Sequence, residues 1–561
     1  MKTTSLLALV TLAPSALVPS VLAQSALEDL WVEQITGGVA TGGFVAADGA
    51  GGVLLFGADS GPIGSPPPAG DELFVARYEM DGTPMWVERF GSSGPEFGTS
   101  ILADGTGGAF VSGRTQGDFG GPLQGLTDGF VARYDASGNR LWLLQDGSTS
   151  TDQFVDLASD GAGGCLALGQ TRGNWAGPNP GGSTEDGVLI RYDAGGNQLW
   201  ATQFGTVDED SPLSVAADGA GGALVAGWTQ GTFPGNAPGD GPSFVARFDP
   251  AGTLTSVVQF GPPNESPNAV IPDGSGGAFV ASRRANGTTS ITIEGTVSRV
   301  DSAGNVAWST SIVTPGPHTL PSAIERDASG TVVVAGTVYD GIIGQGAPGI
   351  ISPTDGFVGR YDATGSLVSY DMFGGPDSDA VLSLALEGAA GIWLGGNTTG
   401  AFGGPSHSGY QLFAARLGLR VGASYCGPAV ANSTGVPGRI VAAGSRAASD
   451  GAMTLVARDL PPQTFGYFLT SRTTGLVPMA GGSQGTLCLG GAVGRYNRAG
   501  EIGATGADGT FPLALDLTST PQPTGTVPIL AGQTWNFQAW YRDANPQVAS
   551  NFTDGVAVAF L

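Results

Sequence analysis

Short apolar segments, separated by turns rich in glycine and polar residues, follow one another along most of the chain. Between residues 99 and 145 they read "TSILA", "GAFVSG", "GFVARYD" and "LWLLQ". "ADGTGG" joins the first two segments and "DASGN" joins the last two, and Asp-Gly is a strong signal for a tight hairpin turn. This pattern predicts a unit of four short antiparallel strands.

The unit recurs seven times. The arginine of "FVARY" marks each copy at an interval of 52 to 61 residues, and a "DGxGG" turn accompanies it, with looser versions in the last two copies. A single four-stranded sheet cannot bury both faces, whereas sheets stacked around an axis can, so the repeat predicts an all-β, seven-bladed β-propeller. The marking arginines are Arg77, Arg133, Arg191, Arg247, Arg299, Arg360 and Arg416.

The phase of the repeat predicts how the ring closes. The first segment, "LEDLWVEQI" at 27–35, matches the fourth strand of a unit, and the last, "YQLFAARL" at 410–417, matches a third strand. We expect residues around 29–35 to pair with residues around 411–417, because this pairing removes two exposed sheet edges.

The repeated motifs resemble a known family, the secreted bacterial seven-bladed propeller repeats called SBBP repeats. The matching pieces are "D-x-F-V-A-R-Y-D-x-x-G-N-x-L-W-x-x-Q-F-G", "A-D-G-x-G-G-x-x-V-x-G-x-T" and "GWTQGTFPG" at 227–235. The resemblance covers residues 27–418. It implies an exported scaffold and no general reaction.

The chain divides into three parts. Residues 1–23 begin with a basic residue, continue with an apolar stretch and end in small residues, which predicts a secretory signal peptide. Residues 24–420 hold the propeller. Residues 421–561 differ in texture, with short strand-like segments such as "TWNFQAWY" between glycines and prolines, and we expect a smaller β-sandwich-like domain there. It resembles C-terminal modules of other secreted bacterial repeat proteins, whose role is undefined.

Net charge and hydropathy restrict the classes of binding partner and the location that we expect for this protein. The formal net charge is −25, which disfavours nucleic-acid binding because the phosphate backbone is repelled. No apolar run after the signal peptide is long enough for a membrane span. We therefore expect a secreted, extracellular or cell-surface protein, with the periplasm as an alternative, and a monomer.

Three cysteines occur, an odd number for an exported protein. Cys426 and Cys488 both lie in the C-terminal part, and we expect them to form a disulfide. Cys165 occupies an apolar strand position and is expected to be a buried small side chain.

A recurring carboxylate follows each "QFG" segment, at the connection between one blade and the next. If these carboxylates meet near the channel mouth, they form an acidic ring that could hold Ca²⁺, which prefers oxygen ligands. The alternative is that each acid caps backbone N–H groups of its turn and recurs only because the blade recurs. The residues are Glu96, Asp152, Asp210 and Asp379, with Glu265 one place early in its unit.

The long loops carry a second recurrence, "G-x-T-x-G-x-[F/W]". Its aromatic rings would suit stacking on a sugar or a peptide at the same face; alternatively, each ring plugs its own loop. These residues are Phe119, Trp175, Phe233 and Phe402.

Two further recurrences are expected to be structural. The tryptophan of the "LW" segment is expected to wedge between blades. An acid five residues before most of the marking arginines is expected to bridge adjacent blades, because a buried arginine needs a partner.

Candidate chemistry is sparse. The two histidines, His318 and His407, fall in predicted loops without metal-site or triad spacing. The favoured hypothesis is a non-enzymatic exported scaffold that presents a propeller face to a protein or a glycan. The alternatives are a carbohydrate-active enzyme with paired carboxylates in the channel, a quinoprotein-like enzyme, and a structural surface-layer component.

Overall fold

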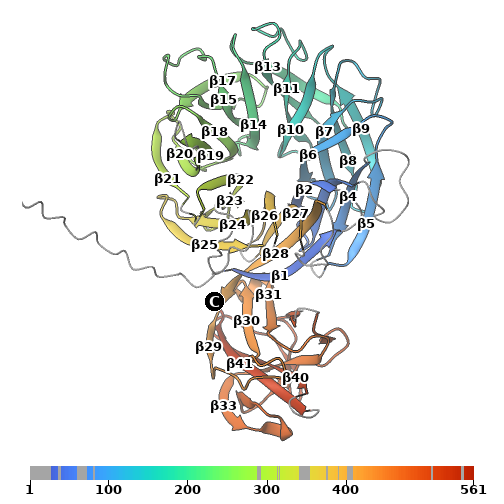
Figure 1. Ribbon diagram of the computed structural model, residues 1–561, viewed down its shortest axis with the longest axis vertical. Coiled ribbons are helices and arrows are strands. Elements are labelled where there is room, and N and C mark those ends of the chain that lie inside the picture. Colours follow the sequence, from blue (N-terminus) through green and yellow to red (C-terminus); the bar gives the residue numbers. More distant parts are fainter. Residues whose placement is uncertain are drawn as a thin grey trace, which may run out of the picture.

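The computed structural model describes residues 27–35, 40–59, 72–79, 82–286, 292–312, 314, 316–339, 354–374, 377–388, 391–400, 409–506, 509–544 and 549–561. The proposed signal peptide, Phe402 and His407 lie outside the described residues. The described part is built almost entirely of β-strands, arranged as a ring of sheets around a central opening with a second unit beside it (Figure 1). Residues 27–420 are called the ring below, and residues 421–561 the tail domain.

Four sheets of the ring have four antiparallel strands each, in sequence order. The hairpin turns between the strands are those that the "DGxGG" and "DxxGN" segments predict. The sheets are β2 (Ala40–Ala47), β3 (Val53–Asp59), β4 (Glu72–Tyr78) and β5 (Pro84–Phe90); β6 (Glu96–Ala103), β7 (Ala109–Thr115), β8 (Asp128–Tyr134) and β9 (Arg140–Asp146); β10 (Asp152–Ser159), β11 (Cys165–Thr171), β12 (Asp186–Tyr192) and β13 (Gln198–Phe204); and β14 (Asp210–Ala217), β15 (Ala223–Thr229), β16 (Ser243–Phe248) and β17 (Leu254–Phe260).

Two more four-strand units are joined into one eight-stranded sheet by a single parallel contact, Ile293 to His318. His318 takes part in this contact, because its Nδ1 accepts a hydrogen bond of 3.1 Å from the amide of Ile293. The strands are β18 (Glu265–Pro272), β19 (Ala278–Asn286), β20 (Thr292–Val300) and β21 (Val306–Ser311), followed by β22 (His318–Arg326), β23 (Val332–Tyr339), β24 (Thr354–Tyr361) and β25 (Leu367–Phe373).

The beginning and the end of the ring meet in one sheet. β1 (Leu27–Ile35) runs antiparallel to β28 (Gln411–Val421), which follows β26 (Asp379–Glu387) and β27 (Gly391–Thr398). The register pairs Leu27 with Leu419 and Ile35 with Leu412. This is the pairing that the phase of the repeat predicts.

Tryptophans fasten neighbouring sheets to one another. In four of the four-strand units the indole N–H of the "LW" tryptophan donates to a backbone carbonyl in the outer hairpin turn of the next unit, at 3.0 to 3.2 Å, so the indole lies between two units. The pairs are Trp86 with Ala136, Trp142 with Ala194, Trp200 with Pro250, and Trp308 with Ala363.

The marking arginines bind a carboxylate of their own sheet, whereas the acid five residues earlier was expected to bridge adjacent blades. Arg133 pairs with Asp104 at 2.8 Å, in the "DGxGG" turn of its own sheet, and not with Asp128. Asp128 lies five residues earlier, which on an extended strand is about 17 Å away at the opposite end. Corresponding pairs are Arg77 with Asp48, Arg191 with Asp160, Arg299 with Asp273, Arg360 with Asp327, and Arg416 with Glu387.

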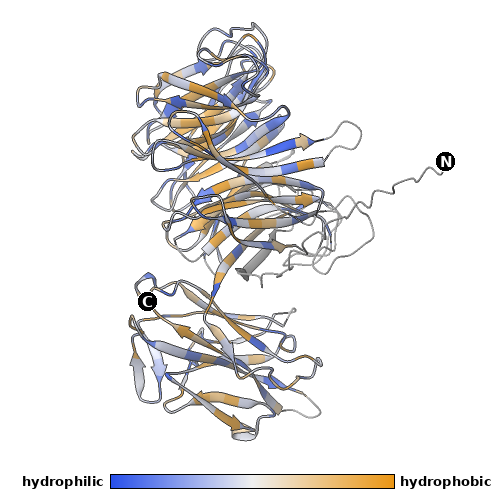
Figure 2. Ribbon diagram, turned by 90° about the vertical axis from the view of Figure 1, so that its left-hand side faces the viewer, coloured by the Kyte–Doolittle hydropathy of each residue, from blue (hydrophilic) through white to orange (hydrophobic). Residues whose placement is uncertain are grey.

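The tail domain continues directly from the ring. The end of β28 pairs with β30 (Arg439–Gly444), through Arg420 with Ala443 and Val421 with Ala442. Figure 2 shows the two units one beyond the other with a narrow connection between them. β28 therefore belongs to both units.

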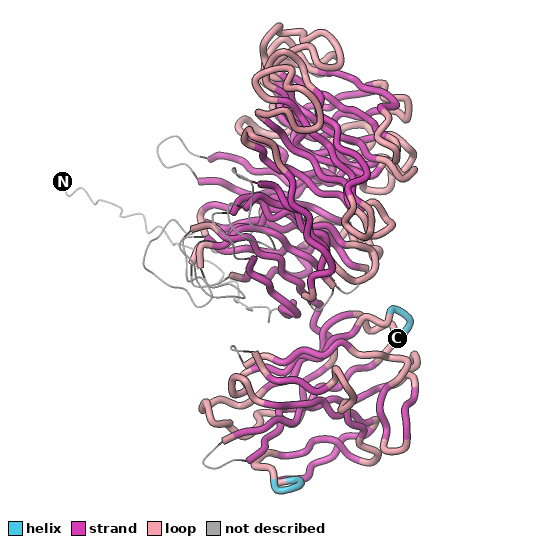
Figure 3. Tube along the Cα trace, turned by 90° about the vertical axis from the view of Figure 1, so that its right-hand side faces the viewer, coloured by secondary structure: helices cyan, strands magenta, loops and turns pink. Residues whose placement is uncertain are grey.

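Two sheets of the tail domain pack against one shared apolar core that includes Leu455, Phe468, Trp535 and Phe537. Two helices are described there, both short 3₁₀ turns, and none in the described part of the chain is long and apolar enough to cross a membrane (Figure 3). The elements are β29 (Ala423–Tyr425), η1 (Ala448–Asp450), β31 (Met453–Arg458), β32 (Phe465–Ser471), β33 (Thr473–Pro478), η2 (Ala480–Gly482), β34 (Thr486–Gly490), β35 (Gly494–Arg495), β36 (Ile502–Ala504), β37 (Phe511–Ala514), β38 (Thr520–Gln522), β39 (Gly525–Val527), β40 (Thr534–Asp543) and β41 (Ala549–Ala559).

The expected disulfide is present. Cys426 and Cys488 are bonded, with their Cα atoms 6.2 Å apart, and the bond ties the start of the tail domain to β34. Cys165 is a free, buried thiol on β11 among apolar neighbours.

Candidate functional site

The carboxylates expected to form an acidic ring are separate. All four are buried, and those with described partners accept hydrogen bonds from residues of their own turn and sheet. Asp152, for example, accepts from the amide and the hydroxyl of Ser148 and from the hydroxyl of Thr171. Among the described residues no group of three or more His, Cys, Asp and Glu side chains could hold a metal ion. The contacts of Glu96, Asp152 and Asp210 favour the alternative that each acid caps its own turn, and the Ca²⁺ ring at Glu96, Asp152, Asp210 and Asp379 stays a prediction.

The structure brings together two acid series that sequence reasoning treated separately. A Cβ atom on Gly205 would lie 2.5 Å from Asp186 Oδ1 and 3.0 Å from Asp210 Oδ2, so the two buried carboxyls flank this glycine. Burial raises the pKa of Asp186 to about 6; a hydrogen bond from Gln203 lowers it, and the charge of Asp210 raises it further. The same arrangement surrounds Gly147, between Asp128 and Asp152, and Gly374, between Asp355 and Asp379. The constant spacing of 24 residues within each pair was the signal that could have revealed it.

The three described loop aromatics pack against other aromatic rings of the ring of sheets. Phe233 is 2% exposed and packs against Phe244. Trp175 lies 4.9 Å from Phe154, centroid to centroid, and Phe119 packs on Phe90 and Phe130. These contacts favour the alternative that each ring plugs its own loop, and the role of these three residues in ligand stacking stays a prediction.

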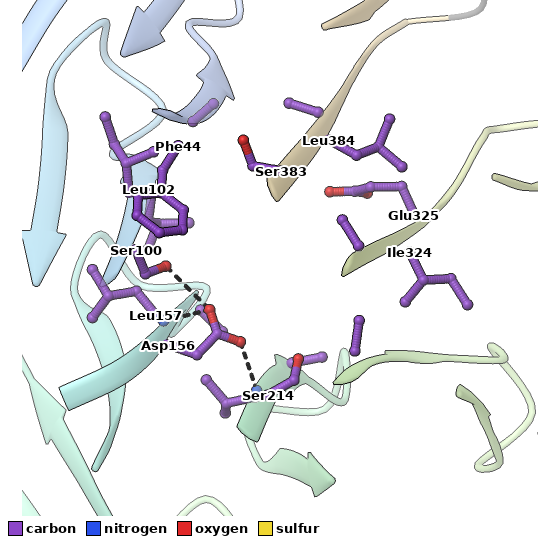
Figure 4. Close-up of a pocket in the computed structure, with 18 of the residues that line it drawn as sticks. Phe44, Ser100, Leu102, Asp156, Leu157, Ser214, Ile324, Glu325, Ser383 and Leu384 are labelled. Carbon is purple, nitrogen blue, oxygen red and sulfur yellow. Dashed lines mark hydrogen bonds between the residues drawn. The ribbon is translucent and has the colours of Figure 1, made fainter. Parts of the chain in front are cut away.

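A cavity of about 600 Å³ occupies the centre of the ring. Its lining comes from the first strand of every four-strand unit: β2, β6, β10, β14, β18, β22 and β26 (Figure 4). Each of these strands carries a β-bulge at the same place, where its register against the next strand shifts. Bulges bend strands and redirect side chains, and here they do so at the wall of the channel.

Asp156 and Glu325 are the two ionisable residues among those that line the channel. Asp156 follows the bulge of β10, and its carboxylate accepts hydrogen bonds from Ser100 Oγ at 3.1 Å, from the amide of Leu157 at 2.9 Å and from the amide of Val215 at 2.8 Å. These donors belong to β6, β10 and β14, so Asp156 joins three neighbouring sheets (Figure 4). Burial raises the pKa of Asp156, and the hydrogen bonds oppose that effect. Its role is structural.

Glu325 is different. Figure 4 shows its side chain reaching from β22 into the opening. Burial alone raises its pKa to about 7. No hydrogen bond or ion pair of its carboxyl is found within the described part of the chain. Sequence reasoning missed both channel residues, because they become visible only when the units are aligned by their bulges.

No protein-family model matches the chain. The regulatory protein FlaEY of Caulobacter vibrioides is 26% identical over 410 residues, which is 64% of this chain and 42% of FlaEY. The chain therefore spans less than half the length of that relative.

Several solved structures align with this chain at low sequence identity. The polysaccharide lyase Uly1 is 10% identical with a TM-score of 0.40, over 67% of this chain and 89% of the lyase. An α-L-arabinanase of Penicillium chrysogenum is 13% identical with a TM-score of 0.35, over 70% of this chain and 99% of the arabinanase. A protein of unknown function from Dyadobacter fermentans is 11% identical with a TM-score of 0.38, over 70% of this chain and all of that one.

Proposed function

We propose that the protein is an exported, non-enzymatic binding scaffold that acts as a monomer outside the cell or at its surface. In this proposal the ring is a seven-bladed propeller of SBBP-type repeats, and the tail domain is a β-sandwich that attaches or docks. The observation that carries the proposal is the channel, a cavity of about 600 Å³ to which every four-strand unit contributes its first strand. A volume of this size is typical of small-molecule sites, and it suits a monosaccharide or a single side chain of a protein partner.

The competing function is a carbohydrate-active enzyme, since Asp156 and Glu325 both line the channel. Glycosidases need two carboxyl groups that are free to exchange a proton or to attack the sugar. Asp156 is committed to three donors from three strands, so one channel carboxyl, Glu325, is available. This arrangement favours binding over catalysis.

Binding can be tested on the purified mature chain with a glycan array and a small-molecule thermal-shift panel, with and without Ca²⁺. We expect retention or stabilisation by at least one compound, independent of Ca²⁺ because the buried carboxylates are capped by protein donors. Replacing Ala217, a half-buried residue of the channel wall, by Phe should abolish that binding and leave the fold intact. If no compound binds, or if release of a reducing sugar accompanies binding, the proposal is rejected.

A further inference from the structure

Glu325 interrupts a ring of apolar side chains. Counting three residues past each bulge places one residue of every first strand at the same level of the channel. At the other six positions the residue is Ala, Leu or Ile: Ala46, Leu102, Ala158, Ala216, Ile271 and Ala385. Glu325 is partly buried at this level, and no partner of its carboxyl is described, so its charged form is less well solvated than at an open surface.

The surroundings of Glu325 contain no cation that could serve as its partner among the described residues. Arg326, the next residue, turns away and donates to the backbone carbonyl of Asp273 at 3.1 Å. The neighbouring first strands contribute residues 268–272 and 382–386 to the lining, and none of these is ionisable. The other channel acid, Asp156, is negative as well, and it is already hydrogen-bonded.

The wall of the cavity combines apolar and polar side chains. Leu102 and Ile271 line it together with the hydroxyl groups of Ser322 and Ser383. The hydrocarbon part of a small amine would contact the apolar side chains, and its cationic group would satisfy Glu325. The ring as a whole is strongly acidic: residues 24–420 hold 15 arginines and 41 acidic residues, a difference of −26, whereas the tail domain holds seven of each. Cationic molecules are therefore attracted toward the ring and anionic ones are repelled.

We propose that the channel binds a small amine, whose ammonium group pairs with Glu325 while its hydrocarbon part contacts apolar side chains of the mixed wall such as Leu102 and Ile271. The inference rests on the proposed binding function and specifies the class of ligand. A neutral alcohol of the same shape would keep the apolar contacts and lose the ion pair.

The test compares benzylamine with benzyl alcohol by isothermal titration calorimetry at pH 6 and pH 8. We expect benzylamine to bind at least tenfold more tightly than the alcohol at pH 8. Its affinity should fall about tenfold at pH 6, because Glu325, with a pKa of about 7, is then mostly protonated while the amine keeps its charge. Glu325→Gln should remove both the preference for the amine and its pH dependence. Glu88→Gln, which removes an equal charge at an exposed position outside the channel, should change neither.

The outcomes separate the two proposals. Equal binding of amine and alcohol, unaffected by Glu325→Gln, overturns the assignment of an amine and leaves the channel as a binding site. If neither compound binds and the wider panel also fails, the binding function itself is rejected. The melting temperature of Glu325→Gln, which we expect to equal or exceed that of the parent protein at pH 8, confirms that the variant is folded.

Discussion

The indole ring of Trp200 covers Gly252, in the hairpin turn of the next sheet, so closely that a Cβ atom on this glycine would lie 2.4 Å from the ring. The indole N–H donates to the carbonyl of Pro250 in the same turn at 3.1 Å. The repeated tryptophan and the repeated glycine thus form two halves of one contact between sheets.

Gly252→Ala should therefore destabilise the ring. Gly252 has φ +81°, which is unfavourable for alanine, and the added methyl group must also displace Trp200. Gly182 is a matched control, because its φ is +82° and a Cβ atom added there would meet nothing within 4 Å. In guanidinium unfolding we expect Gly182→Ala to cost about 1 kcal/mol and Gly252→Ala about 1–3 kcal/mol more. Equal losses would show that the contact with Trp200 contributes nothing.

The ion pair between Arg299 and Asp273 should make the free energy of unfolding depend on pH in the acidic range. Burial by itself raises the pKa of Asp273, but hydrogen bonds from Ser275, Arg299 and Gly277 together lower it to about 2. A depressed pKa stabilises the folded state at pH values above the unfolded-state pKa near 4, and this contribution is lost as pH falls toward 2. Asp273→Asn should reduce the free energy of unfolding by about 1–2 kcal/mol at pH 7, after allowance for the partly exposed arginine. The variant and the parent should converge near pH 2. Asp208→Asn, at an exposed acid, is the control, and a loss at Asp273 that does not change with pH contradicts the argument.

The pKa of Asp186, beside Gly205, is raised and not lowered, so its effect on stability has the opposite pH dependence to that of Asp273. Burial raises the pKa of Asp186 to about 6, so its contribution to stability is fully present below pH 4 and is lost as pH rises through 6. Asp186→Asn should raise the free energy of unfolding at pH 8 by about 1–3 kcal/mol and change it little at pH 4. Denaturant titrations at the two pH values measure this difference. Destabilisation at pH 8 would mean that the ionised form of Asp186 is the one required.

The bond between Cys426 and Cys488 should stabilise the tail domain and leave the ring unaffected. It closes a loop with a sequence separation of 62 residues, for which chain entropy predicts about 4 kcal/mol. In differential scanning calorimetry, a variant with serine at both positions should lower one transition by several degrees and leave the other in place. Cys165→Ala serves as a control in the ring, since it removes the free thiol. A uniform fall of both transitions would show that the two units unfold together.

Strand positions follow from local pattern, because turn residues and apolar alternation act over a few residues. The closing pair followed from the phase of the repeat, and the disulfide from the placement of two cysteines in the same domain. Partners of charged side chains are harder to assign. Arg133 was expected to use an acid from the beginning of a strand, yet it uses Asp104, which the hairpin brings beside it. The alternating direction of side chains says which face a residue occupies, whereas the length of the strand decides which carboxylate an arginine can reach.

The site was the least predictable part. The repeated acids and aromatics are conspicuous because they recur, and recurrence in a repeat protein mostly reflects demands that every blade shares, as Asp152 and Phe233 show. Glu325 does not recur. In a repeat protein, a residue that differs from the equivalent residues of the other repeats is therefore a better indicator of a ligand site than a residue that recurs in all of them.

β28 hydrogen-bonds to β1 along one stretch and to β30 along the next. A pull on the tail domain is consequently delivered along the backbone of the strand that also seals the ring. Antiparallel strands drawn along their length share the load over many bonds at once, instead of opening one bond at a time. Force applied to the tail domain therefore acts on the pairing of β28 with β1 as shear along the strands.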